Sequence, residues 1–129
     1  MWYLIFLLLL VLLYLAYPSK HQPWETNLEK VKERIYQIVP NFSGKFFVST
    51  EQFSYTDDKE KIYLKLVSST GKPFSLDAIT YIAAHEVAHC LVSEIGHGKI
   101  FRNKFDELLN IAFSKGYFNN LNYSEIENE

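Results

Sequence analysis

The residues most suited to chemistry in this 129-residue chain form the pattern His85-Glu86-Val87-Ala88-His89. A helix advances about 100° per residue, so His85 and His89 point in directions about 40° apart and both imidazoles can reach one ion. Neutral imidazole is a zinc ligand, and a catalytic zinc site takes three protein ligands and keeps a fourth position for water. Glu86 lies beside the histidines and can accept a proton from that water. The pattern therefore predicts a zinc centre (Zn2+) for hydrolysis.

The third protein ligand has two candidates. His97 follows His89 by eight residues and stands between Gly96 and Gly98, whose flexibility lets the chain turn back toward the same ion. The competitor is Glu107, a carboxylate on the next expected helix. His97 is the preferred candidate because its path along the chain is shorter, while Glu107 stays open as the alternative.

The two histidines need a helix that also belongs to the core. Ser75 is a suitable N-cap for a helix from about residue 76 to 95, and Gly96 is a suitable stop. The face opposite the histidines is apolar, with Ile79, Ala83 and Val87, and predicts packing against a sheet. One helix is thus expected to carry core on one side and a metal site on the other.

The elements around this helix predict an α+β fold. Thr26 and Glu29 form a capping-box pattern ahead of a helix ending near residue 39, before Pro40. Residues 45–50 and 62–67 are β-rich, 53–55 can add a short strand, and a further amphipathic helix is expected over about 100–115. The strands are therefore expected to form a small antiparallel or mixed sheet, separate from the two late helices.

The N-terminal segment, residues 1–17, is apolar and contains no charged side chain. It predicts one transmembrane helix and hence a single-pass membrane protein, with a cleaved signal peptide as the alternative. The lysines and arginine that follow, with none before, favour a cytoplasmic catalytic domain. The remaining chain divides into a juxtamembrane linker (18–25), a metallopeptidase domain (26–118) and a polar, acidic tail (119–129).

The charge and cysteine content of the chain limit the classes of partner and bond that it can form. The net charge of −2 provides no broad positive field, so no nucleic-acid partner is predicted. The single cysteine, Cys90, excludes a disulfide within the chain and is expected to be a small core residue. Oligomeric state does not follow from the sequence.

Residues 81–105 resemble the zincin metallopeptidases, in particular the WLM and SprT-like groups. His85, Glu86, His89 and His97 match the motif HExxH followed by a histidine; Gly98 and Phe101 match the glycine and aromatic after it. The resemblance implies a zincin fold in which the edge strand of a small sheet holds an extended peptide beside the active-site helix. Residues 62–67 are the expected edge strand.

These observations predict a membrane-anchored zinc metallopeptidase that hydrolyses peptide bonds in a protein or peptide substrate, with Glu86 as general base. The membrane contact would run through residues 1–17. A catalytically silent zincin-like module that binds a partner at the membrane is the alternative, and a structural domain without metal is a third. The intact Glu86 favours the enzyme, because a silent module has no use for a proton acceptor.

Overall fold

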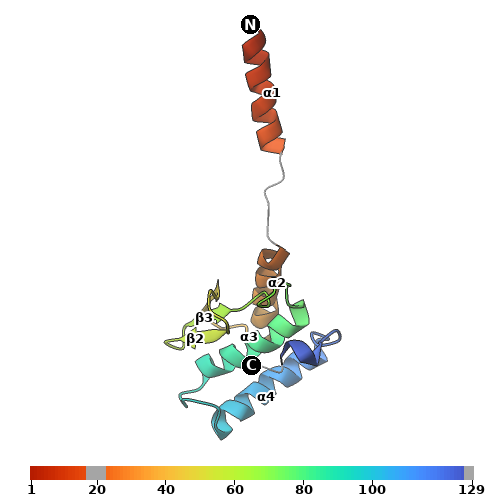
Figure 1. The fold of residues 1–129 in the computed structure, drawn as a ribbon. Helices are drawn as coiled ribbons and strands as arrows, with labels where there is room; N and C mark the ends of the chain where they lie inside the picture. Colours follow the sequence, from red (N-terminus) through yellow and green to blue (C-terminus); the bar gives the residue numbers. More distant parts are fainter. Residues whose placement is uncertain (17–22, 127–129) are drawn as a thin grey trace.

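The computed structural model describes residues 1–16 and 23–126 (Figure 1). Their elements, in chain order, are α1 (Trp2–Ala16), α2 (Pro23–Ile38), β1 (Lys45–Val48), β2 (Tyr55–Asp57), β3 (Lys61–Leu64), α3 (Leu76–Leu91), α4 (Lys99–Ser114) and the 3₁₀ helix η1 (Tyr123–Glu125). This order confirms an α+β fold whose strands precede the two late helices.

The sheet is small and mixed, with strand order β1-β3-β2. β3 pairs in parallel with β1 and antiparallel with β2. The expectation that residues 62–67 form an edge strand is therefore wrong: β3 lies in the middle of the sheet. Its alternate side chains, Ile62 and Leu64, are fully buried, which suits a strand with a neighbour on each side. The edge strands are β1 and β2.

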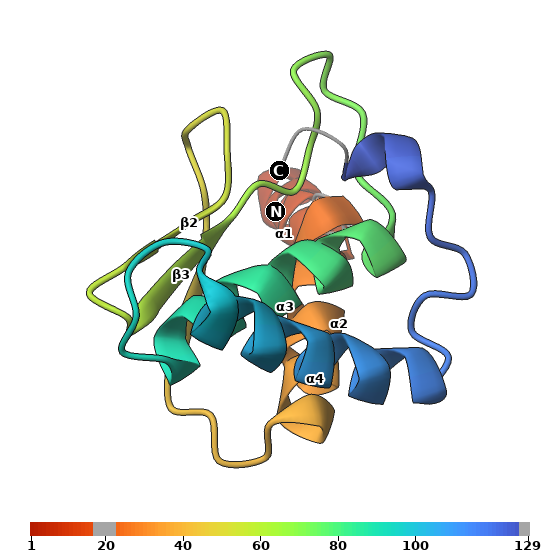
Figure 2. The same cartoon turned by 90° about the horizontal axis from the view of Figure 1, so that it is seen from below.

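Helix α3 runs through the centre of the domain (Figure 2) and contacts α2, α4, β2 and β3. Its face opposite the histidines is completely buried at Ile79, Ala83 and Val87, as the apolar pattern predicted. Small residues on this helix let its neighbours approach closely, so the position of α3 is fixed from several sides at once. The residues of the HExxH pattern therefore stand on a helix that packs against four other elements.

The helix boundaries differ from the predicted ones in two places. α2 begins at Pro23, which suits the first turn because proline lacks the N–H that would have no partner there, so Thr26 lies inside the helix and does not cap it. α3 starts as expected, with the Ser75 hydroxyl accepting a hydrogen bond from the N–H of Ala78, but it ends at Leu91. The chain is already extended at Val92, four residues before Gly96.

No helix among the described residues, 1–16 and 23–126, is long and apolar enough to cross a membrane. α1 is uncharged, but its 15 residues reach only about 22 Å, against a hydrocarbon core of about 30 Å. The prediction of a single-pass protein anchored through residues 1–17 is therefore wrong, and the cytoplasmic placement that depended on it loses its basis. Of the expected linker, residues 18–22 lie outside the described residues and 23–25 belong to α2.

The polar tail contacts the domain over part of its length. The N–H of Asn120 donates to the Asp77 carboxylate (2.8 Å), and the Glu125 carboxylate accepts from the N–H of Ser75 (2.8 Å). Both contacts are made at the start of α3. The boundary at residue 118 stays a prediction, but the segment up to residue 126 helps to hold the N-terminal end of the central helix.

Arg34 joins three parts of the domain. Its guanidinium donates to the Asp77 carboxylate (2.8 Å), the Thr80 hydroxyl (3.2 Å) and the carbonyl of Tyr117 (3.1 Å), and it lies 4.5 Å from the centre of the Tyr117 ring. Asp77 is buried and Arg34 is largely so. Removing one partner of such a pair leaves the other desolvated without its counter-charge.

We therefore expect Asp77→Ala to lower the free energy of unfolding by about 2–4 kcal/mol, near the range for breaking a buried ion pair. Urea denaturation followed by circular dichroism measures this loss. Glu29→Ala is the matched control, because the Glu29–Lys32 pair is exposed and should contribute less than about 1 kcal/mol. Equal losses for the two variants would contradict the structural role of the buried pair.

Candidate metal and catalytic site

Three histidines meet at the C-terminal half of α3. The Nε2 atom of His89 lies 3.3 Å from that of His85, one helical turn earlier, and 3.1 Å from that of His97, in the loop between α3 and α4. One ring nitrogen from each of the three lies within 4.8 Å of the other two. Residues separated by up to 12 positions thus converge on one point.

The spacing of these nitrogens suits a metal ion. A tetrahedral zinc with Zn–N distances of about 2.0–2.1 Å holds its ligand nitrogens about 3.3 Å apart, close to the two Nε2–Nε2 distances here. Three imidazoles are also one of the ligand sets found in catalytic zinc sites. By both spacing and chemistry, the three histidines are able to hold a metal ion.

The surroundings keep two of these imidazoles neutral. Burial, followed by the nearby His89 and His97 rings, lowers the pKa of His85 to about 4. Burial, then His97 and Lys59, also lowers the pKa of His89. A neutral imidazole presents the lone pair that a metal ion needs, so at neutral pH both side chains are in the ligating form.

Phe101 packs against the imidazole rings of all three histidines. Its side chain is buried at the start of α4 and stacks on His89, with ring centroids 4.2 Å apart and planes 21° apart. Its centroid is also 5.0 Å from that of His85 and 4.9 Å from that of His97. A buried ring in contact with all three imidazoles limits their rotamers, which reduces the entropy lost when they bind an ion.

Glu86 lies in the same region and is held by the edge strand. The Thr56 hydroxyl of β2 lies 2.5 Å from Oε2 of Glu86 and 3.3 Å from its backbone carbonyl oxygen. The Glu86 side chain is buried. A carboxylate that accepts a hydrogen bond from a fixed strand has few orientations open to it, so Thr56 positions Glu86.

Lys59, in the turn between β2 and β3, explains why α3 ends early. Its ammonium group donates to the carbonyls of His89 (2.9 Å), Val92 (2.6 Å) and Glu94 (3.2 Å). The last carbonyls of a helix lack partners within the helix, and its C-terminal end carries a partial negative charge. A lysine there donates hydrogen bonds to the carbonyls and interacts favourably with the charge. These contacts fasten the end of α3, and the loop that follows it, to the β2–β3 turn.

The loop that carries His97 is held at its other end by Glu94. The Glu94 carboxylate accepts from the N–H of Phe101 (3.3 Å), in the first turn of α4, where Gly98 offers no side-chain cap. A Cβ at Gly98 would collide with this carboxylate. Gly96 has φ +91°, which glycine adopts readily. The two glycines therefore allow the loop to follow the path that brings His97 back to the helix.

Glu107, the alternative third ligand, lies apart from this cluster. It is an exposed residue of α4, and its carboxylate pairs with the Lys104 ammonium at 2.9 Å. Among the described residues, the group of close potential ligands is made of the three histidines. The structure thus brings His97 toward His85 and His89, and it does not bring Glu107.

Cys90 does not join the site chemistry. Its side chain is partly buried and packs against the core. Burial, with Glu86 nearby, raises the pKa of its thiol to about 11, so the thiolate that would bind metal or attack a substrate is disfavoured at neutral pH. This agrees with the prediction of a core residue, although Cys90 is not fully enclosed.

A cleft of about 500 Å³ opens over the histidines. One side of it is formed by β2 and the residues just before it, and another by the loop after α3. Its lining residues are Phe53, Ser54, Tyr55, Thr56, Asp58, Lys59, His85, Glu86, His89, Glu94, Ile95, Gly96 and His97. The candidate catalytic groups therefore face a space that a polypeptide segment can enter.

Sequence reasoning did not identify the residues that position the site. Thr56 and Lys59 follow the short strand expected at 53–55, and their contacts reach 30 to 35 positions along the chain. Lys59 has φ +55°, which is uncommon outside glycine, but a single sequence gives no sign of it. Glu94 was read as part of α3. No periodic pattern marks any of these three.

Comparison with known proteins adds information about the fold. No family model matches the chain. A relative, "Uncharacterized protein 136R" of Invertebrate iridescent virus 6, is 32% identical over 68 residues, which is 50% of this chain; the chain spans only 38% of that protein's length.

Two solved structures of Wss1 from Saccharomyces cerevisiae are similar in fold. A mutant form has a TM-score of 0.60 and 22% identity, over 76% of this chain and 90% of the other. The second has a TM-score of 0.56 and 23% identity, over 70% and 79%. At such identities the likeness concerns the fold alone. The overall fold of this chain is therefore similar to that of Wss1.

Proposed function

We propose that this chain is a zinc-dependent metallopeptidase of the WLM type. The observation that carries the proposal is the convergence of His85, His89 and His97, whose Nε2 atoms have the spacing of tetrahedral zinc ligands. The likeness in fold to Wss1 supports the same group. In this proposal the three imidazoles hold the ion and Glu86 is the general base.

Each residue has a distinct task in this mechanism. A zinc ion held by the three histidines would supply the polarising charge that makes water a nucleophile near neutral pH. The Glu86 carboxylate accepts the proton of the attacking water and then delivers it to the leaving amine of the peptide. Thr56 keeps that carboxylate oriented, while Phe101 limits the motion of the imidazoles.

The peptide substrate is proposed to bind along β2. This strand lies at the edge of the sheet, and Tyr55 and Thr56 line the cleft over the histidines. An extended peptide can add to such an edge through backbone hydrogen bonds, which bind many sequences with similar strength. This docking places a peptide bond between the edge strand and α3.

The test combines metal analysis with hydrolysis. The full chain, purified without chelator or supplied again with zinc, should hold about one zinc per chain and cleave unfolded casein. A chelator should abolish cleavage and zinc should restore it. No zinc after reconstitution would refute the metal site; zinc without cleavage of any peptide in a broad mixture would favour a silent binding module.

Thr56→Val is expected to lower kcat about 10- to 100-fold while leaving zinc content and KM close to those of the parent. Valine has the same shape but no hydroxyl, so the Glu86 carboxylate loses a hydrogen bond of a charged acceptor, a loss of about 1.5–3 kcal/mol. Steady-state kinetics on one peptide and metal analysis measure the two effects separately.

Thr56→Ser is the matched control, because it retains the hydroxyl and should recover most of the activity. A variant that lost activity through unfolding would also lose zinc. If valine and serine reduced kcat equally, the hydroxyl would have no part in positioning Glu86.

A further inference from the structure

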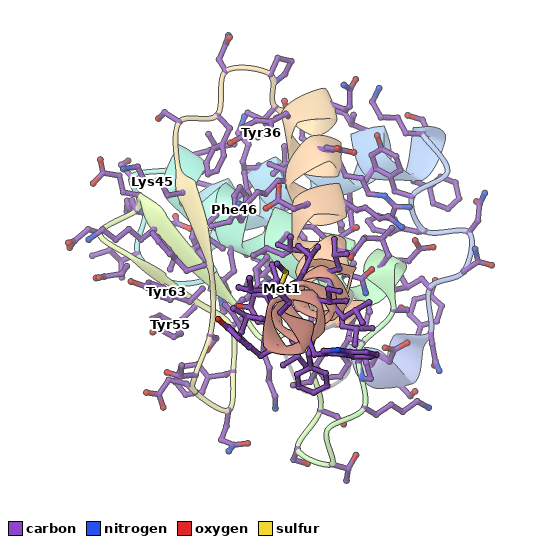
Figure 3. All side chains as sticks on the ribbon, turned by 90° about the horizontal axis from the view of Figure 1, so that it is seen from above. Met1, Tyr36, Lys45, Phe46, Tyr55 and Tyr63 are labelled. Atoms are coloured by element: carbon purple, nitrogen blue, oxygen red, sulfur yellow. The ribbon has the colours of Figure 1, made fainter. Side chains whose placement is uncertain are left out.

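Three aromatic rings form a row across the exposed face of the sheet. Phe47 of β1, Tyr63 of β3 and Tyr55 of β2 occupy partner positions in the strand register. The rings of Phe47 and Tyr63 are stacked with centroids 5.2 Å apart, and those of Tyr63 and Tyr55 are stacked at 4.7 Å. Figure 3 shows Tyr55 and Tyr63 side by side on the sheet.

This row stops at the edge strand that lines the cleft. Tyr55 is its last ring, and Phe53, more than half exposed, packs edge-on against Tyr55 with centroids 5.7 Å apart. Both residues also line the cleft over the histidines. The aromatic row and the candidate active site therefore share Tyr55, and Phe53 adjoins both.

A peptide strand added beside β2 would continue the row. Strand side chains alternate between the two faces. The peptide residue opposite Thr56 would turn toward α3 and Glu86, while its neighbour opposite Tyr55 would turn toward the exposed face. Directly opposite side chains on adjacent strands lie about 4.5–5.5 Å apart, close enough for packing. That neighbour would meet the Tyr55 ring, with Phe53 beside it.

We infer that the enzyme selects substrates with an aromatic or bulky aliphatic side chain opposite Tyr55, an inference that rests on the proposed function. Aromatic pairs between neighbouring strands are favourable partners, and Tyr55 has such a partner, Tyr63, on one side. The position beside Tyr55 on the other side is the place of the substrate. Tyr55 and Phe53 are thus the specificity-determining residues.

Charge in this region favours an apolar peptide over a charged one or a nucleic acid. Residues 45–65 contain four lysines and four carboxylates, so the sheet carries no net charge. Two charged groups of the cleft are already engaged, since the Lys59 ammonium binds three carbonyls and the Glu94 carboxylate caps α4. Aromatic contact is therefore the main means of selection near the edge.

The experiment measures the kcat/KM of the zinc-loaded full chain on peptides that differ at one position. Cleavage of a mixed peptide pool, read by mass spectrometry, first identifies the register. Peptides with Phe, Leu, Ala, Lys or Asp next to the residue that faces the cleft are then compared. The Phe and Leu peptides should exceed the Ala peptide by about 2- to 10-fold, and the Lys and Asp peptides should not exceed it.

Variants assign the preference to its residues. Tyr55→Ser and Phe53→Ser should bring the Phe-to-Ala ratio toward one. Phe47→Ser is the matched control, because it removes a ring at the other end of the same row, separated from β2 by β3, and should leave that ratio within twofold. The Tm of each variant is measured, so a loss of sheet stability is recognised as such.

The outcomes separate this inference from the proposed function. Cleavage without a preference for Phe or Leu, or an equal loss of the ratio in Phe47→Ser, overturns the inference and leaves the peptidase intact. The same peptides are titrated by fluorescence anisotropy against zinc-loaded Glu86→Gln, which needs no turnover. Selective binding of Phe and Leu peptides when the parent cleaves nothing supports the inference and refutes the peptidase.

Discussion

Glu86→Gln should bind zinc like the parent chain and lose peptide hydrolysis by about 10²–10⁴-fold or more, the range expected when a general base is removed. Glutamine has the size and shape of glutamate, and its amide oxygen can accept the hydrogen bond that Thr56 gives to the carboxylate. The fold and the three imidazoles should therefore remain, while the group that takes the proton of water is gone. Metal analysis and steady-state kinetics on the same preparation measure both properties.

The control for this change is Glu107→Gln, an equal substitution at an exposed glutamate of α4. It should alter neither zinc content nor kcat. If Glu86→Gln kept activity near that of the parent, Glu86 would have no role as base and the proposed mechanism would be wrong. If it lost zinc as well, the effect on kcat would not report on proton transfer.

The site helix illustrates what a single sequence can predict. Ser75, the apolar face at Ile79, Ala83 and Val87, and the two histidines each follow from local geometry, and the structure has α3 start and pack as expected. Local rules suffice here because capping and periodicity involve residues within four positions of one another. The α+β class followed in the same way.

The end of α3 and the order of the strands could not be predicted in this way. Gly96 marks a turn, but the helix stops earlier, where Lys59 from another element binds the carbonyls of His89 in the last turn and of Val92 at the C-cap. β3 is central because it pairs with β1 as well as with β2, although β2 lies between β1 and β3 in the sequence. No pattern within residues 62–67 reveals this pairing. As a result the strand that lines the cleft is β2, the shortest of the three.

Two mutants distinguish the candidates for the third zinc ligand, because His97 and Glu107 lie in different places. Loss of a residue that only orients a metal ligand costs roughly 10–100-fold in metal affinity. His97→Ala removes one of the three imidazoles themselves, so it should weaken zinc binding by more than that. Glu107→Ala should leave the affinity within a few-fold, because its carboxylate pairs with Lys104 on the exposed side of α4. Competition with a chromophoric chelator measures both constants.

Which of the two mutants loses more zinc affinity decides which residue is the third ligand, since either mutant alone could disturb the region indirectly. His97 stands in a loop, so its replacement should leave the core, and hence the Tm without metal, nearly unchanged. With zinc, the parent should gain stability by binding to the folded state, and His97→Ala should gain much less. If Glu107→Ala instead lost the metal while His97→Ala kept it, α4 would have to turn its acidic edge to the ion. That would separate Phe101 from the imidazoles it now supports, and the three-histidine site would be wrong.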